Sequence, residues 1–216
     1  MADTKGTQRK YRSPLREEAA RRTREAVVAA AAEVFVREGY TGATIEQVAA
    51  RAGVSRPTVF GVGNKAQLFA LARQRAATGG RLTANDEGFQ HVLATDEAAR
   101  LLEEFAAFTA AISRRLGPLQ FVLEQGAGTD PDLADLLESS QRELLECARS
   151  IVAALASRGA LRHDISRQAA ADVLWLQIQP GNYRRLVEER GWSRNAFERW
   201  HAAAMTTALL EPPTAR

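Results

Sequence analysis

The chain has 216 residues, enough for one or two domains with a buried core. A single cysteine excludes an intrachain disulfide, and neither a signal peptide nor an apolar run of membrane-spanning length is visible, so we expect a cytoplasmic protein. The formal charge is only +3, yet residues 1–65 hold twelve Lys and Arg against seven Asp and Glu. This basic N-terminal third predicts that a polyanion contacts that end of the protein.

The first predicted elements are a basic arm and a long helix. Residues 1–12 have little apolar content to fold with, so we expect a disordered arm. Its basic side chains are placed to contact DNA phosphates or a minor groove: Lys5, Arg9, Lys10 and Arg12. Helical periodicity then runs from about Ser13 to Glu38, with Pro14 suited to the first turn and Gly39 to the end.

Residues 44–65 have the pattern of a helix-turn-helix, two short helices joined by a tight turn that contains a glycine. Thr44 and Gln47 are spaced as a capping box at the start of the first short helix. Gly53 suits the left-handed backbone conformation that commonly ends a helix.

The second short helix carries the features of a DNA-recognition helix. Ser55 is a good N-cap, and Pro57 is tolerated because amides in the first turn have no partner within the helix. Arg56 and Thr58 lie near the N-terminus, where a recognition helix meets base edges. A plain helical hairpin would share the turn, but these exposed polar residues favour DNA binding.

Helical patterns fill the rest of the chain. A fourth helix begins at Lys65, capped by Asn64, and Gly79–Gly80 follows its end. No alternation of apolar and polar residues persists long enough for a sheet, so the predicted fold is all-α. Beyond residue 80 we expect helices at about 96–116, ended by Gly117–Pro118, and at 118–126, 130–158, 166–190 with a break at Pro180–Gly181, and 193–210.

This arrangement resembles the tetracycline-repressor (TetR) family of bacterial transcription regulators. The matching positions lie between about residues 15 and 72: Phe35, Gly39, Tyr40, Thr44, Ile45, Val48, Ala49, Ala52 to Ser55, Pro57 to Phe60, Asn64, Lys65 and Leu68. Past residue 80 the resemblance rests on length and helical pattern. Phe60 stands where the family usually has tyrosine, and Gly61–Gly63 leave the segment before Lys65 one residue short.

The resemblance implies a non-enzymatic repressor without a cofactor. It would bind a pseudo-palindromic, double-stranded DNA operator as a homodimer paired through its last two helices, and a small, largely apolar ligand would release it. The implied organisation is a disordered arm at 1–12, a helix-turn-helix DNA-binding domain at 13–64, a connecting helix at 65–79, and a larger helical ligand-binding and dimerisation domain at 80–216. The candidate DNA contacts are Arg9, Lys10, Arg12, Thr44, Ser55, Arg56, Pro57, Thr58, Phe60 and Lys65.

Aromatic and apolar side chains on the later helices are the candidate lining of the ligand pocket. They are Phe105, Phe108, Ile112, Phe121, Gln125, Cys147 and Trp175. Such stripes are more often core packing than ligand walls. No spacing of catalytic or metal-binding residues accompanies them, because His91, His163 and His201 lie on separate segments.

Two other functions are compatible with the sequence. The first is an architectural DNA-binding protein that responds to no ligand and has no accessible cavity in its C-terminal region. The second is a helical interaction module whose N-terminal unit does not bind DNA, which the glycine-rich segment Gly61–Gly63 suggests. Binding to the DNA upstream of the gene would distinguish a regulator from either.

Overall fold

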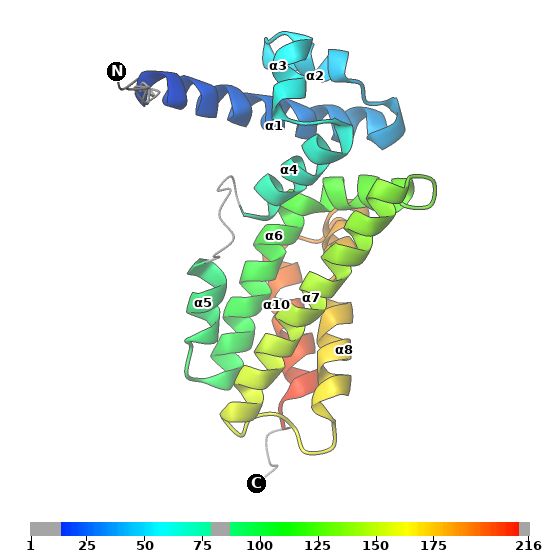
Figure 1. Cartoon of the computed structure of the whole chain (residues 1–216). Coiled ribbons are helices and arrows are strands. Elements are labelled where there is room, and N and C mark those ends of the chain that lie inside the picture. Colours follow the sequence, from blue (N-terminus) through cyan, green and yellow to red (C-terminus); the bar gives the residue numbers. More distant parts are fainter. Residues whose placement is uncertain (1–13, 79–86, 212–216) are drawn as a thin grey trace, which may run out of the picture.

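The computed structural model describes residues 14–78 and 87–211, and in these ranges the regular elements are helices apart from one isolated bridge between Leu161 and Leu210. The all-α fold predicted from the sequence is confirmed. Figure 1 shows α1 lying across one end of the molecule, with the long helices of the C-terminal region below it and α4 between the two. The predicted arm at residues 1–12 lies outside the described residues.

The N-terminal helices are bounded as the local sequence predicts. They are α1 (Pro14–Gly42), α2 (Ile45–Ala52), α3 (Arg56–Val62) and α4 (Lys65–Ala77). The helical backbone of α1 is interrupted at Gly39, whose φ of 70° is readily adopted only by glycine. At α2 the capping box is present, with Thr44 N donating to Gln47 Oε1 at 2.8 Å. Gly53 ends α2 with φ 67°.

The C-terminal helices surround a second core. They are α5 (Glu87–Leu93), α6 (Ala98–Gly126), α7 (Pro131–Ser157), α8 (Arg167–Gln177), α9 (Pro180–Tyr183), the π-helical η1 (Arg184–Glu189) and α10 (Arg194–Leu209). The predicted break at Pro180 is present, and Ser166 and Ser193 cap α8 and α10. The short helix α5 has no counterpart among the sequence predictions.

The predicted helix end at Gly117–Pro118 is wrong, because α6 continues through Pro118 to Gly126. A proline inside a helix removes one backbone hydrogen bond and costs about 3 kcal/mol. Burial offsets that cost here: Leu119 and Leu123, both beyond the proline, are buried in the core that also holds α1 and α4. Tertiary packing therefore outweighs the tendency of Gly117–Pro118 to end a helix.

One apolar cluster extends from the N-terminal helices into the C-terminal region. Phe35 and Tyr40 of α1 pack against Phe69 of α4, with ring centroids 4.9 Å and 5.4 Å from Phe69. Leu119 of α6 and Leu133 of α7 belong to the same cluster. The domain boundaries expected from the sequence stay predictions, but α3, the predicted recognition helix, packs through Val59 on a core that both parts of the chain share.

His201 of α10 is an unusual member of the C-terminal region. Only 2% of its surface is exposed, and within the described part of the chain neither ring nitrogen forms a hydrogen bond of regular geometry, although the Gln177 backbone lies close enough to favour the protonated ring. Its ring packs against Phe197 and Trp200, with centroids 5.1 Å and 6.0 Å away. Burial lowers the pKa of His201 to about 4. The histidine is therefore neutral at physiological pH.

Acidification should destabilise the protein through His201. The pKa falls from 6.5 to about 4 on folding, so in that pH window the unfolded chain binds a proton that the folded protein excludes. The contribution of His201 to the unfolding free energy is then fully present above pH 6.5 and is lost as the pH decreases toward about 4. We expect about 2 kcal/mol of the unfolding free energy to disappear between pH 7 and pH 5.

Urea unfolding of the wild type and of His201→Phe, at both pH values and one protein concentration, measures this contribution. The substitution removes only this imidazole from the chain, so the difference between the two pH dependences belongs to His201. Equal losses of stability in the two proteins would contradict the assignment.

Candidate nucleic-acid interface and ligand cavity

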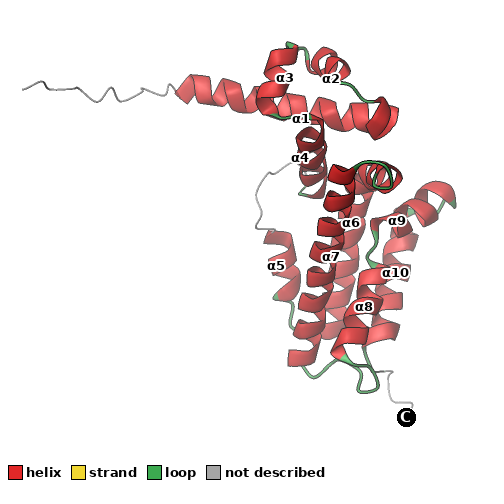
Figure 2. Cartoon of the chain, turned by 45° about the vertical axis from the view of Figure 1, so that its right-hand side comes forward, coloured by secondary structure: helices red, strands yellow, loops and turns green. Residues whose placement is uncertain are grey.

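The N-terminus of α3 is exposed at the end of the molecule far from the C-terminal helices. Figures 1 and 2 both show α2 and α3 on the side of α1 that faces away from those helices. Val59 anchors α3 in the shared core, whereas Ser55, Arg56 and Pro57 are exposed. Phe60 is also exposed, over 55% of its surface. This geometry leaves the first turn of α3 and Phe60 available to a large partner.

Hydroxyl groups at the helix starts are already used for capping. Thr44 Oγ1 accepts from Gln47 N at 3.2 Å. Ser55 Oγ accepts from Thr58 N at 3.4 Å and lies 2.8 Å from Thr58 Oγ1. Hydroxyl oxygens can form more than one hydrogen bond, so these caps do not prevent a contact with phosphate or a base. Their DNA contacts stay predictions.

Arg56 is engaged by a carboxylate that the sequence analysis did not single out. Its Nη2 lies 2.7 Å from Glu46 Oε1, and both side chains are more than half exposed. An exposed ion pair of this kind contributes little, about 0–1 kcal/mol. Arg56 can therefore leave Glu46 for a DNA group at small cost. Glu46 occupies the first turn of α2, where an acidic residue is favourable to the helix dipole.

Lys65 has contacts within the protein that the sequence did not predict. Its Nζ donates to the Thr41 carbonyl oxygen at 3.2 Å and lies 4.7 Å from the centre of the Tyr40 ring. Desolvation lowers the pKa of Lys65. These contacts hold the start of α4 against the end of α1. A phosphate contact by Lys65 stays a prediction, as do those of Arg9, Lys10 and Arg12, which lie outside the described residues.

A cavity of about 600 Å³ lies against α4, α6, α7 and the start of α9. Two of the predicted ligand residues, Ile112 and Cys147, line it together with Leu116 and Leu144. The lining also includes polar and charged side chains: Arg73, Gln74, Thr78, Gln120, Ser140, Gln141, Glu143 and Gln179. Its size falls in the range of small-molecule sites, about 300–1,000 Å³.

The other five predicted ligand residues lie outside this lining. Phe105 is fully buried in the C-terminal core, and Phe108 stacks on Phe89 with centroids 6.0 Å apart. Trp175 packs against the same core. Phe121 and Gln125 are exposed, and the Arg184 guanidinium lies 4.5 Å from the Phe121 ring. The aromatic stripes thus serve the core and the surface more than this cavity.

Arg73 is the cavity residue that the sequence analysis missed. It bridges three helices, because Nη1 donates to Gln120 Oε1 of α6 at 2.9 Å and Nη2 donates to Ser140 Oγ of α7 at 3.0 Å. Burial lowers the pKa of Arg73 to about 10, which still leaves it charged at neutral pH. The sequence does contain a signal for this position, because Arg73 follows Phe69 by four residues and therefore falls on the apolar face of α4.

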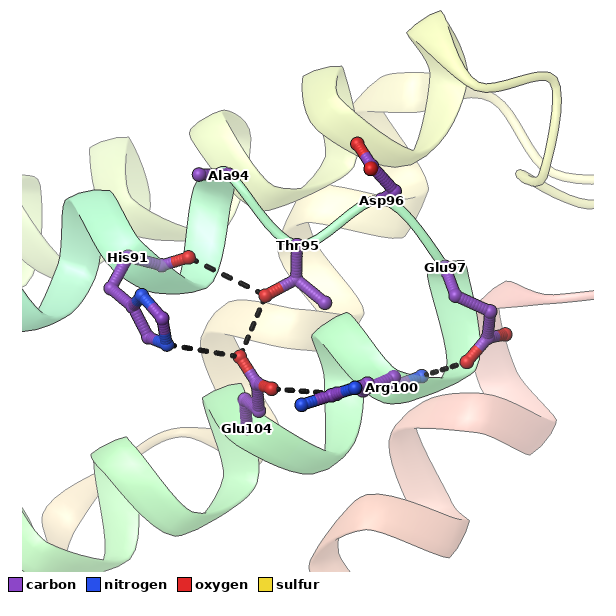
Figure 3. A pocket seen from close by; sticks show the side chains of 7 residues that line it. All are labelled: His91, Ala94, Thr95, Asp96, Glu97, Arg100 and Glu104. Atoms are coloured by element: carbon purple, nitrogen blue, oxygen red, sulfur yellow. Dashed lines mark hydrogen bonds and ion pairs between the residues drawn. The ribbon is translucent and has the colours of Figure 1, made fainter.

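Figure 3 shows a smaller pocket, of about 340 Å³, at the turn between α5 and α6. Glu104 accepts from Thr95 Oγ1 at 2.6 Å and from Arg100 Nε at 2.9 Å, and these hydrogen bonds lower its pKa. His91 Nε2 lies 3.9 Å from the same carboxylate. Because the charged groups already contact one another, we interpret this network as fixing the turn.

Neither a metal site nor a membrane span is found where the structure can be described. Residues 14–78 and 87–211 contain no group of three or more His, Cys, Asp or Glu side chains arranged to hold a metal ion. None of the described helices combines the length and apolarity needed to cross a membrane.

The exposed recognition helix agrees with the comparison to protein families. Residues 27–72 match the family described as bacterial regulatory proteins, tetR family. These residues form a tetR-family helix-turn-helix domain. The resemblance drawn from the sequence is confirmed, and with it the assignment to transcription regulation. The comparison with curated protein sequences found no match.

Solved structures of tetR-family regulators share the fold over most of the chain. SmeT in complex with triclosan is 18% identical with a TM-score of 0.68, covering 88% of this chain and 92% of SmeT. SmeT is the repressor of a Stenotrophomonas maltophilia multidrug efflux pump. NalD, the secondary repressor of the MexAB-OprM multidrug efflux pump in Pseudomonas aeruginosa, is 20% identical with a TM-score of 0.67, covering 89% and 98%.

A TetR transcriptional regulator from Chloroflexus aurantiacus is 22% identical with a TM-score of 0.65, covering 90% of this chain and 100% of that one. At such identities the likeness concerns the fold alone. It supports an N-terminal helix-turn-helix followed by a larger helical region.

Replacing Arg56 by alanine should relax the base preference at one position of each half-site. An arginine can bond a guanine edge through two donors, which discriminates between bases by about 1–3 kcal/mol. Affinities for an operator selected from random duplexes, for its single-base variants and for random DNA, measured at one salt concentration by fluorescence anisotropy, reveal the change.

Arg51→Ala is the matched control. Arg51 is similarly exposed and also pairs with a carboxylate, Glu33, but it lies at the end of α2. We expect this variant to alter binding to all sequences alike. If Arg56→Ala also weakens operator and random DNA by one factor, Arg56 contacts only phosphate.

Proposed function

We propose that the protein is a repressor that binds a pseudo-palindromic operator as a homodimer through α3, and that a small molecule in the cavity beside α4 releases it. One observation carries the proposal. The recognition helix exposes its N-terminal turn, and the core beneath it continues into the helices that line the cavity. DNA contact and ligand contact thus act on one connected set of side chains.

Exposed apolar side chains on the last helices support dimerisation there. Leu176 of α8 is 62% exposed, and Trp192 and Trp200 beside and within α10 are partly exposed as well. Large apolar and aromatic side chains on a surface are typical of the centre of a protein–protein interface. The predicted pairing of the last two helices with those of a second copy would bury them.

Leu176→Glu should shift the protein from dimer to monomer. A carboxylate in an apolar interface is desolvated without a partner, which disfavours association. Sedimentation velocity at micromolar concentration measures the species directly. Leu15→Glu is the control, because Leu15 is an exposed leucine of α1 at the opposite end of the chain, and it should leave the dimer intact. A monomeric wild type, or a dimeric Leu176→Glu, would exclude this interface.

Release by a ligand requires little energy if it changes the separation of the two recognition helices. Half-sites must lie about 34–36 Å apart for both helices to enter successive major grooves. A ligand that binds more tightly to a misfitting dimer lowers DNA affinity by linkage. A coupling of about 1–3 kcal/mol changes affinity about 5–150-fold.

Filling the cavity should block the response to the ligand while sparing DNA binding. Cys147→Trp adds an indole at a position that lines the cavity. Ala153→Trp places the same side chain at an exposed position of the same helix and serves as control. After operator selection, a panel of small apolar and amphipathic compounds is tested for release of each protein from the duplex.

We expect wild type and Ala153→Trp to be released by the same compounds, and Cys147→Trp to bind the operator without being released by them. Failure of the wild type to bind any selected duplex would contradict the repressor function. Release of Cys147→Trp at wild-type concentrations would place the ligand elsewhere.

A further inference from the structure

Among the residues that the structure describes, Arg73 is a buried charge without a contacting counter-charge. Only 6% of its surface is exposed. Within the described residues its hydrogen-bond partners are the amide oxygen of Gln120 and the hydroxyl of Ser140, both uncharged, and it forms no ion pair there. Buried charged groups are normally paired, because transfer of an isolated ion from water is costly. Within the described ranges, the guanidinium therefore has hydrogen-bond partners but no counter-charge.

The nearest carboxylates do not fill that role. Glu143, which also lines the cavity, and Glu124 influence Arg73 electrostatically, but within the described residues neither forms an ion pair with it. Both are exposed. Glu124 Oε1 instead accepts from Gln120 Nε2 at 2.9 Å, which turns the amide oxygen of Gln120 toward Arg73. This arrangement holds the guanidinium in place and leaves the positive charge on the cavity wall.

The rest of the lining would suit an apolar chain. Ile112, Leu116, Leu144 and Cys147 line the same cavity, whose remaining lining includes Glu143 and the polar group around Arg73. A guanidinium presents a planar fork of donors that matches a carboxylate through two parallel hydrogen bonds. The guanidinium of Arg73 thus offers a site for an anion, and the aliphatic side chains offer a surface for a hydrocarbon tail.

We infer that the cavity binds an amphipathic carboxylate, with the carboxylate on Arg73 and the apolar chain along the aliphatic side chains. This inference rests on the proposed function of the cavity and specifies the chemical class of its ligand. The anion supplies the missing counter-charge, and its oxygens compete with Gln120 and Ser140 for the donors of Arg73. Since those two residues tie α4 to α6 and α7, binding acts directly on the helix that supports the DNA-binding unit.

The test compares three ligands with one tail and different head groups: decanoate, decanol and decylamine. Calorimetric titration of the full-length protein without DNA, below the micelle concentration of each compound, measures their dissociation constants. We expect decanoate to bind at least about tenfold more tightly than decanol, since a charge-assisted hydrogen bond contributes more than a neutral one. Decylamine should bind more weakly than decanol.

Variants of Arg73 then assign the preference to that residue. Arg73→Gln should lower decanoate affinity to the level of decanol and leave decanol binding unchanged. Arg73→Lys keeps the charge and should retain part of the preference. Arg75→Gln is the matched control, because Arg75 lies two residues further along α4 and lines a different groove, between α1 and α6. It should bind all three ligands as the wild type does.

Several results would overturn the inference. They are equal binding of the three compounds by the wild type, no binding of decanoate at millimolar concentration, and a decanoate preference that survives in Arg73→Gln. If Arg73→Gln does not fold, as judged by circular dichroism, the wild-type head-group series and Arg73→Lys still decide the question. Operator binding is measured separately, so loss of the repressor function and loss of the carboxylate preference are distinguishable.

Discussion

The apolar core shared by the two parts of the chain is the constraint on which the rest of the structure depends. Phe69 of α4 contacts Phe35 and Tyr40 on one side, while Leu119 and Leu133 enter the same cluster from α6 and α7. Protein interiors are close-packed and respond to displacement by repacking rather than by gradual deformation. A shift of α4 against the C-terminal helices must therefore be transmitted to α1 and to the helix-turn-helix that it supports.

Polar contacts fix the orientation of α4 against the C-terminal helices, because apolar burial alone specifies no particular orientation. Arg115 of α6 donates to the Ala76 and Ala77 carbonyl oxygens at 2.9 Å and 3.0 Å, at the negative end of the α4 dipole. Arg73 ties the middle of the same helix to α6 and α7. Two arginines thus fix α4 at different points, and only Arg73 borders the cavity of about 600 Å³. A group bound in that cavity would therefore act on the attachment of α4 to α6 and α7 at Arg73.

The DNA-facing end is organised differently, since its charged groups are exposed and weakly held. The ion pair between Arg56 and Glu46 is open to solvent, so water and salt screen it and exchange of partners is easy. Arg73, in contrast, is desolvated and cannot change partners without another polar group taking their place. In the proposed function, attraction of DNA and response to a ligand would therefore depend on charges in opposite environments.

The sequence alone determined the helix starts and turns at the DNA-binding end. The caps at Thr44, Ser55 and Asn64 and the left-handed Gly53 are local interactions between residues no more than a few positions apart, so their spacing is sufficient to predict them. For the same reason the exposed first turn of α3 and its candidate DNA contacts could be proposed before the structure.

Only the tertiary structure decided which faces are buried together. Pro118 lies inside a helix because Leu119 and Leu123, which follow it, reach a core made by distant segments. Periodicity identified Phe105 and Phe108 as apolar helix faces but could not tell which neighbour covers them, and they pack in the core and against Phe89. The role of Arg73, a charged residue on the apolar face of α4, could be seen only in the tertiary structure, because residues of α6 and α7 complete the cavity that it lines. Burial depends on contacts between residues far apart in the chain, which no local pattern encodes.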